Sequence, residues 1–116
     1  MTNINKRMIC SIKEDAAVNY LANLGHTILT RNFWTKYGEI DIISEFSDTI
    51  VFTEVKYRDN ISYGYPEEAV TLKKQHSIQS AALFYISKNK LSLDKPYRFD
   101  VIVIIKDNIK HIENAF

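Results

Sequence analysis

The chain has 116 residues, 46% hydrophobic side chains and a formal net charge of +1. This length and composition describe a single globular domain over residues 1–116 and argue against intrinsic disorder. The near-neutral charge lacks the strongly basic character of proteins that coat DNA, although clustered charges would still allow nucleic-acid binding.

The chain carries no apolar run that approaches the length of a membrane span, and no signal peptide with an apolar core at its N-terminus. We therefore expect a cytoplasmic protein without a membrane partner. Cys10 is the single cysteine, which excludes an internal disulfide and a cysteine-rich metal site.

The first predicted element is a helix over residues 11–24. Residues 1–9 are polar and mixed, so we expect a loose N-terminus. Ser11 and Glu14 have the spacing of a capping box, and Gly25 stands where a glycine often ends a helix. The local pattern favours Glu14 as the capping partner, and an acid directed toward the carboxylates of the next elements is the alternative.

A strand over residues 26–34 and a turn at 35–38 lead into a predicted β-hairpin. Two runs rich in Ile, Val and Phe, at 39–46 and 50–56, flank the turn formers at 47–49. Runs this short with these residue types are typical of strands.

The hairpin register has two candidates, which differ in the two residues that form the loop. A loop of Ser47 and Asp48 places Asp41 opposite Glu54, and a loop one residue later places Asp41 opposite Lys56. Because side chains alternate with period two, both registers put one set of charged residues on one face: Glu39, Asp41, Glu54 and Lys56. A divalent cation would satisfy such carboxylates, but a surface hairpin with weak cross-strand ion pairs also fits the spacing.

The loop over residues 57–65 carries Arg58 and three tyrosines, which either stack on nucleotides or cover an edge of the core. A first helical turn is predicted at 66–70, and Thr71 is a second candidate N-cap for a helix over 72–88. Lys73 and Lys74 lie in its first turn, the unfavourable end for cations. They indicate either an anionic neighbour such as a phosphate or a solvated lysine pair.

A near-continuous β-branched run over residues 97–106 predicts a strand buried on both faces, and a short last strand is expected at 109–113. Asp100 interrupts the buried strand, and Arg98 or a lysine is its expected partner. The three histidines have no ligand spacing, so each is interpreted as structural or exposed. The order α-β-β-β-α-β, with a short extra strand, predicts an α/β or α+β fold whose central mixed sheet is flanked by helices.

Several stretches in this order resemble the YraN-like family of small, uncharacterised bacterial proteins, and more broadly the restriction-endonuclease-like PD-(D/E)xK superfamily. The matching stretches are EDAA at 14–17, YL at 20–21, GEIDII at 38–43, VFTEVK at 51–56, YG at 63–64, PEEAVT at 66–71 and RFDV at 98–101. Together they cover most of the chain.

The resemblance implies a restriction-endonuclease-like fold and a nuclease-like site akin to that of archaeal Holliday-junction resolvases. By this likeness, Asp41 and Glu54 hold Mg²⁺ or Mn²⁺ with help from the Val55 carbonyl. Lys56 orients or polarises the attacking water or balances charge on the phosphate, and Glu14 reaches the site from the first helix. A second set contacts nucleic acid: Arg58, Lys73, Lys74 and Gln75.

The resemblance implies nucleic acid as the partner, with DNA, including branched DNA, as the expected substrate, and it implies a homodimer. Two features depart from the family pattern. Lys13 and Cys10 stand where glycines are usual, and the basic run after Lys56 is thin, which lowers the expected DNA affinity. A non-catalytic module that binds nucleic acid or protein on the same fold is therefore the alternative to an endonuclease.

Overall fold

The computed structural model describes residues 3–58 and 70–116, with side chains from residue 12 onward. The predicted first turn at 66–69 and most of the tyrosine loop lie outside these residues. The elements are α1 (Asn3–Leu24), β1 (Thr27–Thr35), β2 (Gly38–Phe46), β3 (Thr49–Arg58), α2 (Leu72–Lys88), β4 (Tyr97–Ile105) and β5 (Asn108–Ile112).

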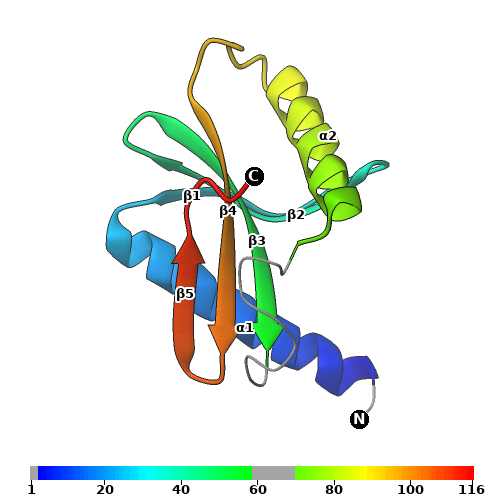
Figure 1. Ribbon diagram of the computed structural model, residues 1–116, viewed down its shortest axis with the longest axis vertical. Coiled ribbons are helices and arrows are strands. Elements are labelled where there is room, and N and C mark those ends of the chain that lie inside the picture. Colours follow the sequence, from blue (N-terminus) through cyan, green and yellow to red (C-terminus); the bar gives the residue numbers. More distant parts are fainter. Residues whose placement is uncertain (1–2, 59–69) are drawn as a thin grey trace.

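The strands form one mixed sheet in the order β1-β2-β3-β4-β5. β3 and β4 are parallel, and the other neighbouring pairs are antiparallel. The helix α2 connects the two parallel strands, since a parallel pair needs a long crossover. The mixed sheet with two helices confirms the predicted fold class, and Figure 1 shows α2 beside the upper part of the sheet and α1 crossing its lower part.

The core has two apolar clusters, one on each face of the sheet. Ile43, Phe52 and Val101 pack with the buried side of α2, whereas Ile42 and Ile102 pack with α1. The predicted stripe of α2 is buried as expected, at Ile78, Ala82, Tyr85 and Ile86. No helix in the described part of the chain is long and apolar enough to span a bilayer.

The start of α1 was predicted wrongly. The helix begins at Asn3 rather than near residue 11, so Ser11 lies inside it. The preceding turns of helix satisfy the amide groups that a capping Ser11 would have bound. The C-terminal end is as predicted: Gly25 has φ +108°, and its N–H and that of His26 donate to the carbonyls of Ala22 and Leu21 in a Schellman arrangement.

The hairpin of β2 and β3 adopts the first of the two candidate registers. Phe46 pairs with Thr49, and Ser47 and Asp48 form a two-residue loop with φ of +49° and +69°. Positive φ at both loop positions is the signature of a type I′ turn, whose twist matches that of the strands. The register then continues unbroken to the pair Ile42–Thr53.

β2 separates from β3 just beyond that pair, at Asp41. Ile40 packs in the cluster under α2, whereas Ile42 packs in the cluster under α1. Two residues of a regular strand would share a face, so the alternation is interrupted between them. In β1, Asn32 has φ +52° at the same level. Asp41 therefore lies where two neighbouring strands begin to diverge.

Candidate active site

Asp41 and Glu54 meet at the divergence of β2 and β3. Where the β2–β3 ladder has ended, the Asp41 carboxylate replaces a backbone acceptor: its Oδ2 accepts the Val55 N–H at 2.8 Å. The strand β3 continues under α2 and carries Glu54 and Lys56 on the face that packs against that helix. The divergence thus brings two carboxylates from adjacent strands close enough for each to affect the ionisation of the site.

Glu54 is a buried acid with incomplete partners. Its residue is only 5% exposed, and its Oε1 lies 3.5 Å from Lys56 Nζ and 4.0 Å from Lys74 Nζ. Its Oε2 is buried, and no residue in the described ranges 12–58 and 70–116 forms a hydrogen bond with it. Burial and the neighbouring Asp41 raise the pKa of Glu54 to about 7, against the smaller lowering effect of the two lysines.

The acidic side chains around Glu54 also have raised pKa values. Burial raises the pKa of Asp41, although the Val55 N–H and the charges of Lys74 and Lys56 oppose the shift. Burial and Asp41 also raise the pKa values of Glu39 and Glu14. The nearby cations Lys56, Lys74 and Arg31 therefore offset only part of the cost of these four carboxyl groups.

Glu14, on α1, interacts electrostatically with Asp41. Its Oε1 lies 3.4 Å from the Arg31 Nε, and Arg31 also binds Asp15 at 2.6 Å. Since Ser11 is inside the helix, the capping-box interpretation of Glu14 is wrong. The charge of Asp41 contributes to the raised pKa of Glu14, after burial.

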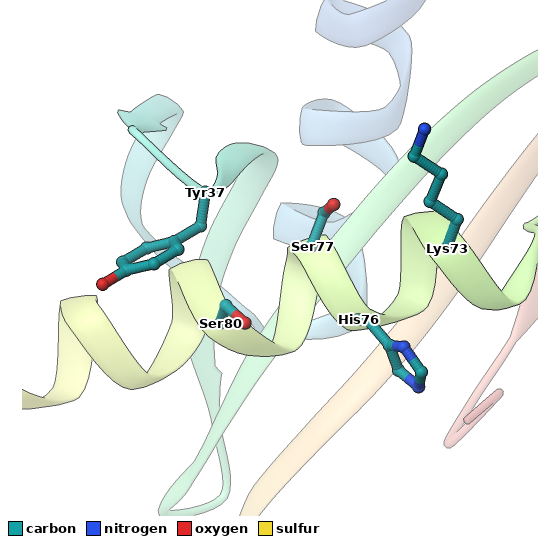
Figure 2. A pocket seen from close by; sticks show the side chains of 5 residues that line it. All are labelled: Tyr37, Lys73, His76, Ser77 and Ser80. Atoms are coloured by element: carbon teal, nitrogen blue, oxygen red, sulfur yellow. The ribbon is translucent and has the colours of Figure 1, made fainter.

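The predicted nucleic-acid contacts divide into two groups. Lys74 joins the site through Glu54. Gln75 instead donates from Nε2 to the Val70 carbonyl at the start of α2, and Arg58 donates to the Tyr57 carbonyl at the end of β3. Lys73 extends from the exposed face of α2 and lines a separate cavity (Figure 2).

The oxygen ligands available at the divergence suit a hard divalent cation that needs few ligands from the protein. Within residues 12–58 and 70–116, no three Asp, Glu, His or Cys side chains gather as a ready ligand group. Asp41 and the unpartnered Oε2 of Glu54 offer two carboxylates, and the Val55 carbonyl is a third candidate ligand. Mg²⁺ commonly takes one or two carboxylates and keeps several waters, so this set suits it.

A second polar cluster, which the sequence did not assign, surrounds Asp100 on β4. Asp100 is fully buried and accepts two hydrogen bonds from Arg98 at 2.8 and 2.9 Å, one from His111 Nε2 at 2.7 Å and one from the Asn114 N–H at 3.0 Å. Burial alone would raise the pKa of Asp100, but these hydrogen bonds and the charge of Arg98 lower it. The expected Arg98 partner is confirmed, and the i, i+2 spacing on one strand face was the available signal.

Two histidines that are distant in sequence, His26 and His111, lie near each other in this cluster and have structural roles. His26 bonds Ser44 at 2.9 Å, and its ring centroid lies 6.4 Å from that of His111. The Tyr20 hydroxyl lies 3.3 Å from His111 Nδ1. Among the described residues, the buried Thr53 hydroxyl beside Asp100 has no hydrogen-bond partner, and this unsatisfied group is neutral rather than charged.

Comparisons with known proteins give a consistent result. The model of the uncharacterised protein family UPF0102 matches residues 13–104. A UPF0102 protein of Lachnoclostridium phytofermentans is 45% identical over 97% of this chain and 96% of its own length. UPF0102 proteins of Persephonella marina and Clostridioides difficile are each 50% identical over 89% of this chain, covering 88% and 91% of their own lengths.

Proposed function

The chain belongs to the uncharacterised protein family UPF0102, the family that its YraN-like motifs indicated, and from this premise we propose a metal-dependent endonuclease-like function on DNA. The proposed reaction is phosphodiester hydrolysis at the site formed by Asp41, Glu54 and Lys56. The likeness to Holliday-junction resolvases, the branched substrate and the homodimer stay predictions, because a shared fold does not establish a shared activity.

One observation carries the proposal: Glu54 keeps a buried carboxylate oxygen that no described residue hydrogen-bonds, beside the half-buried carboxylate of Asp41. An orphaned, desolvated acid oxygen is costly, so chains retain such groups mainly at sites where a ligand completes them. Lys56 and Lys74 supply only part of the missing positive charge, since Glu54 retains a raised pKa in their presence.

The residues have distinct proposed roles. Asp41 and Glu54 hold a Mg²⁺ or Mn²⁺ ion, with the Val55 carbonyl as a further ligand. When bound, the ion supplies charge stabilisation of the phosphate and acidifies a water molecule. Lys56, 3.5 Å from Glu54, orients the attacking water or neutralises a phosphate oxygen, and Lys74 approaches the same carboxylate from α2.

A second candidate function, a non-catalytic module that binds nucleic acid or protein, has its own support. The net charge is +1, and the described residues provide two rather than three converging carboxylates. In that case the carboxylates would remain from an ancestral site, and metal would promote no cleavage.

A cleavage assay separates the two functions. We would incubate wild-type protein with Mn²⁺ and labelled single-stranded, duplex and four-way-junction DNA, beside Lys56→Ala and the control Lys90→Asn. Lys90 is exposed at the far end of α2 and has φ +54°, which Asn tolerates. We expect Mn²⁺-dependent products, a roughly hundredfold slower rate for Lys56→Ala and no change for Lys90→Asn.

Two outcomes would contradict the endonuclease. Equal rates for the wild type and Lys56→Ala would remove Lys56 from the mechanism. A wild-type protein that cuts none of these substrates would favour the non-catalytic module.

A further inference from the structure

A groove runs along the exposed side of α2, outside the carboxylate site. The turn between β1 and β2 places Tyr37 over the helix, and Figure 2 shows its ring reaching toward Ser80 while Ser77 and Lys73 follow along the helix. A cavity of about 520 Å³ is lined by Tyr37, Lys73, His76, Ser77 and Ser80. This cavity is broadly open to solvent, so it is a shallow groove on the surface rather than an enclosed pocket.

The lining of this cavity selects for an anion. It contains one ammonium group, two hydroxyls, an imidazole and a phenol, and no carboxylate. Lys73 lies in the first turn of α2, where the helix dipole also favours negative charge. A second ammonium, from Lys36, lies 5.2 Å from the centroid of the Tyr37 ring. A phosphate group matches the Lys73 ammonium and the Ser77 hydroxyl, which extend from the same side of α2, whereas His76 extends from the opposite side (Figure 2).

The groove continues into an apolar part. A cavity of about 340 Å³ shares Tyr37 and Ser80 with the first and is completed by Leu83 and Phe84. Tyr37, Leu83 and Phe84 are 47%, 60% and 44% exposed, respectively. An aromatic ring beside exposed apolar side chains is a stacking surface for a planar base. The two parts together match one nucleotide, with its phosphate at Lys73 and its base at Tyr37.

The groove begins next to the carboxylate site. Gly38 lies against Ser77, since a Cβ added to Gly38 would meet the Ser77 Cβ at 3.2 Å. The next residue, Glu39, responds to the charges of Asp41 and Lys74. A single strand of nucleic acid that lies along α2 would therefore pass from the Tyr37 groove toward Asp41 and Glu54.

We infer that the Tyr37 groove holds one unpaired nucleotide of the DNA strand that the proposed active site cleaves. The inference rests on the proposed function and narrows its substrate to DNA with a single-stranded segment next to the scissile phosphate. A duplex would keep its bases stacked on each other, so they would not lie on Tyr37.

Binding without catalysis tests the groove. Fluorescence anisotropy with a labelled 12-nucleotide oligo(dT) in EDTA measures affinity when no metal is present. Tyr37→Ala should weaken binding about tenfold through lost stacking, and Tyr37→Phe should restore it. Lys73→Ala should reduce the slope of log K against log salt by about 0.7, the value for one phosphate contact on a single strand.

Lys90→Asn is the matched control, because it removes the same charge from the other end of α2. Lys88, the last residue of the helix, is roughly 22 Å from Lys73 at 1.5 Å per residue, and Lys90 follows it. We expect wild-type affinity and salt dependence for this variant. Thermal melting of each variant checks that it is folded.

Three results would overturn the inference. They are no binding of oligo(dT) by the wild type, equal binding by wild type and Tyr37→Ala, and thymidine monophosphate binding as tightly as the oligonucleotide. The last result would make the groove a site for free nucleotides. Each is distinguishable from failure of the proposed function, which would appear as absent Mn²⁺ binding at Asp41 or absent cleavage.

Discussion

Two buried carboxylates on adjacent parallel strands have opposite surroundings. Asp100 on β4 accepts hydrogen bonds from Arg98, His111 and the Asn114 amide, and its pKa is lowered. Glu54 on β3 has one oxygen near two lysines and one without a partner in the part of the chain that the structure describes, and its pKa is raised to about 7. The hydrogen bonds of the fold satisfy the first acid, whereas the second keeps one oxygen that the described residues leave unsatisfied.

The difference separates structural from functional burial of charge. A satisfied buried acid stabilises its surroundings only while all its partners remain, and removing one leaves the others unpaired. An unsatisfied buried acid lowers the stability of the fold, so its retention needs another reason. We propose that Glu54 is retained because it binds a cation together with Asp41.

The largest expected effect comes from breaking the satisfied cluster. Asp100→Asn leaves Arg98 and His111 facing a neutral amide, and should lower the free energy of unfolding by about 3–5 kcal/mol. Urea denaturation at pH 7 measures it. The control Asp48→Asn, at an 80% exposed turn position, should change stability by less than about 1 kcal/mol. Equal effects from both variants would show that the Asp100 network is not structural.

Substitution of Glu54 is expected to change the free energy of unfolding in the opposite direction. A carboxyl group with a raised folded pKa holds its proton to a higher pH in the folded than in the unfolded chain. Its contribution to stability is therefore complete below pH 4.5 and is lost as the pH rises to about 7. Glu54→Gln should be more stable than wild type by about 2–3 kcal/mol at pH 8, without metal, and equal to it near pH 4.

Denaturation midpoints across this pH range check the Glu54 prediction. Glu113→Gln is the control, because Glu113 is 60% exposed and 4.0 Å from Arg98. It should stay within about 0.5 kcal/mol of wild type at every pH. A Glu54→Gln variant that is less stable than wild type at pH 8 would mean that the lysines fully satisfy Glu54.

Much of the fold could be predicted from the sequence because its signals are local. Thr71 caps α2 through its hydroxyl and the Lys74 N–H, and α2 spans the predicted residues. The turn formers Ser47 and Asp48 fix the register of the hairpin through two positive φ angles. Local signals can also mislead, as Ser11 and Glu14 did, when an upstream segment continues the helix.

The candidate site could be predicted only in part. Alternation along the hairpin brought Asp41 and Glu54 together in advance, but the separation of β2 from β3 at Asp41 depends on packing of Ile40 against α2. The Asp100 network joins residues from β4, β5 and the C-terminal segment, and the groove pairs a turn tyrosine with a helix face. Contacts between such distant segments leave no pattern in sequence spacing.

Calorimetric titration of Mn²⁺ into the wild type, Asp41→Asn and Asp48→Asn at pH 8 tests the central claim most directly. At this pH Glu54 is ionised. Asp48→Asn removes the same charge from the turn of the same hairpin. We predict one Mn²⁺ per chain for the wild type and Asp48→Asn, and no binding for Asp41→Asn. Equal binding by Asp41→Asn, or no binding by the wild type, would contradict a metal site at the divergence of β2 and β3.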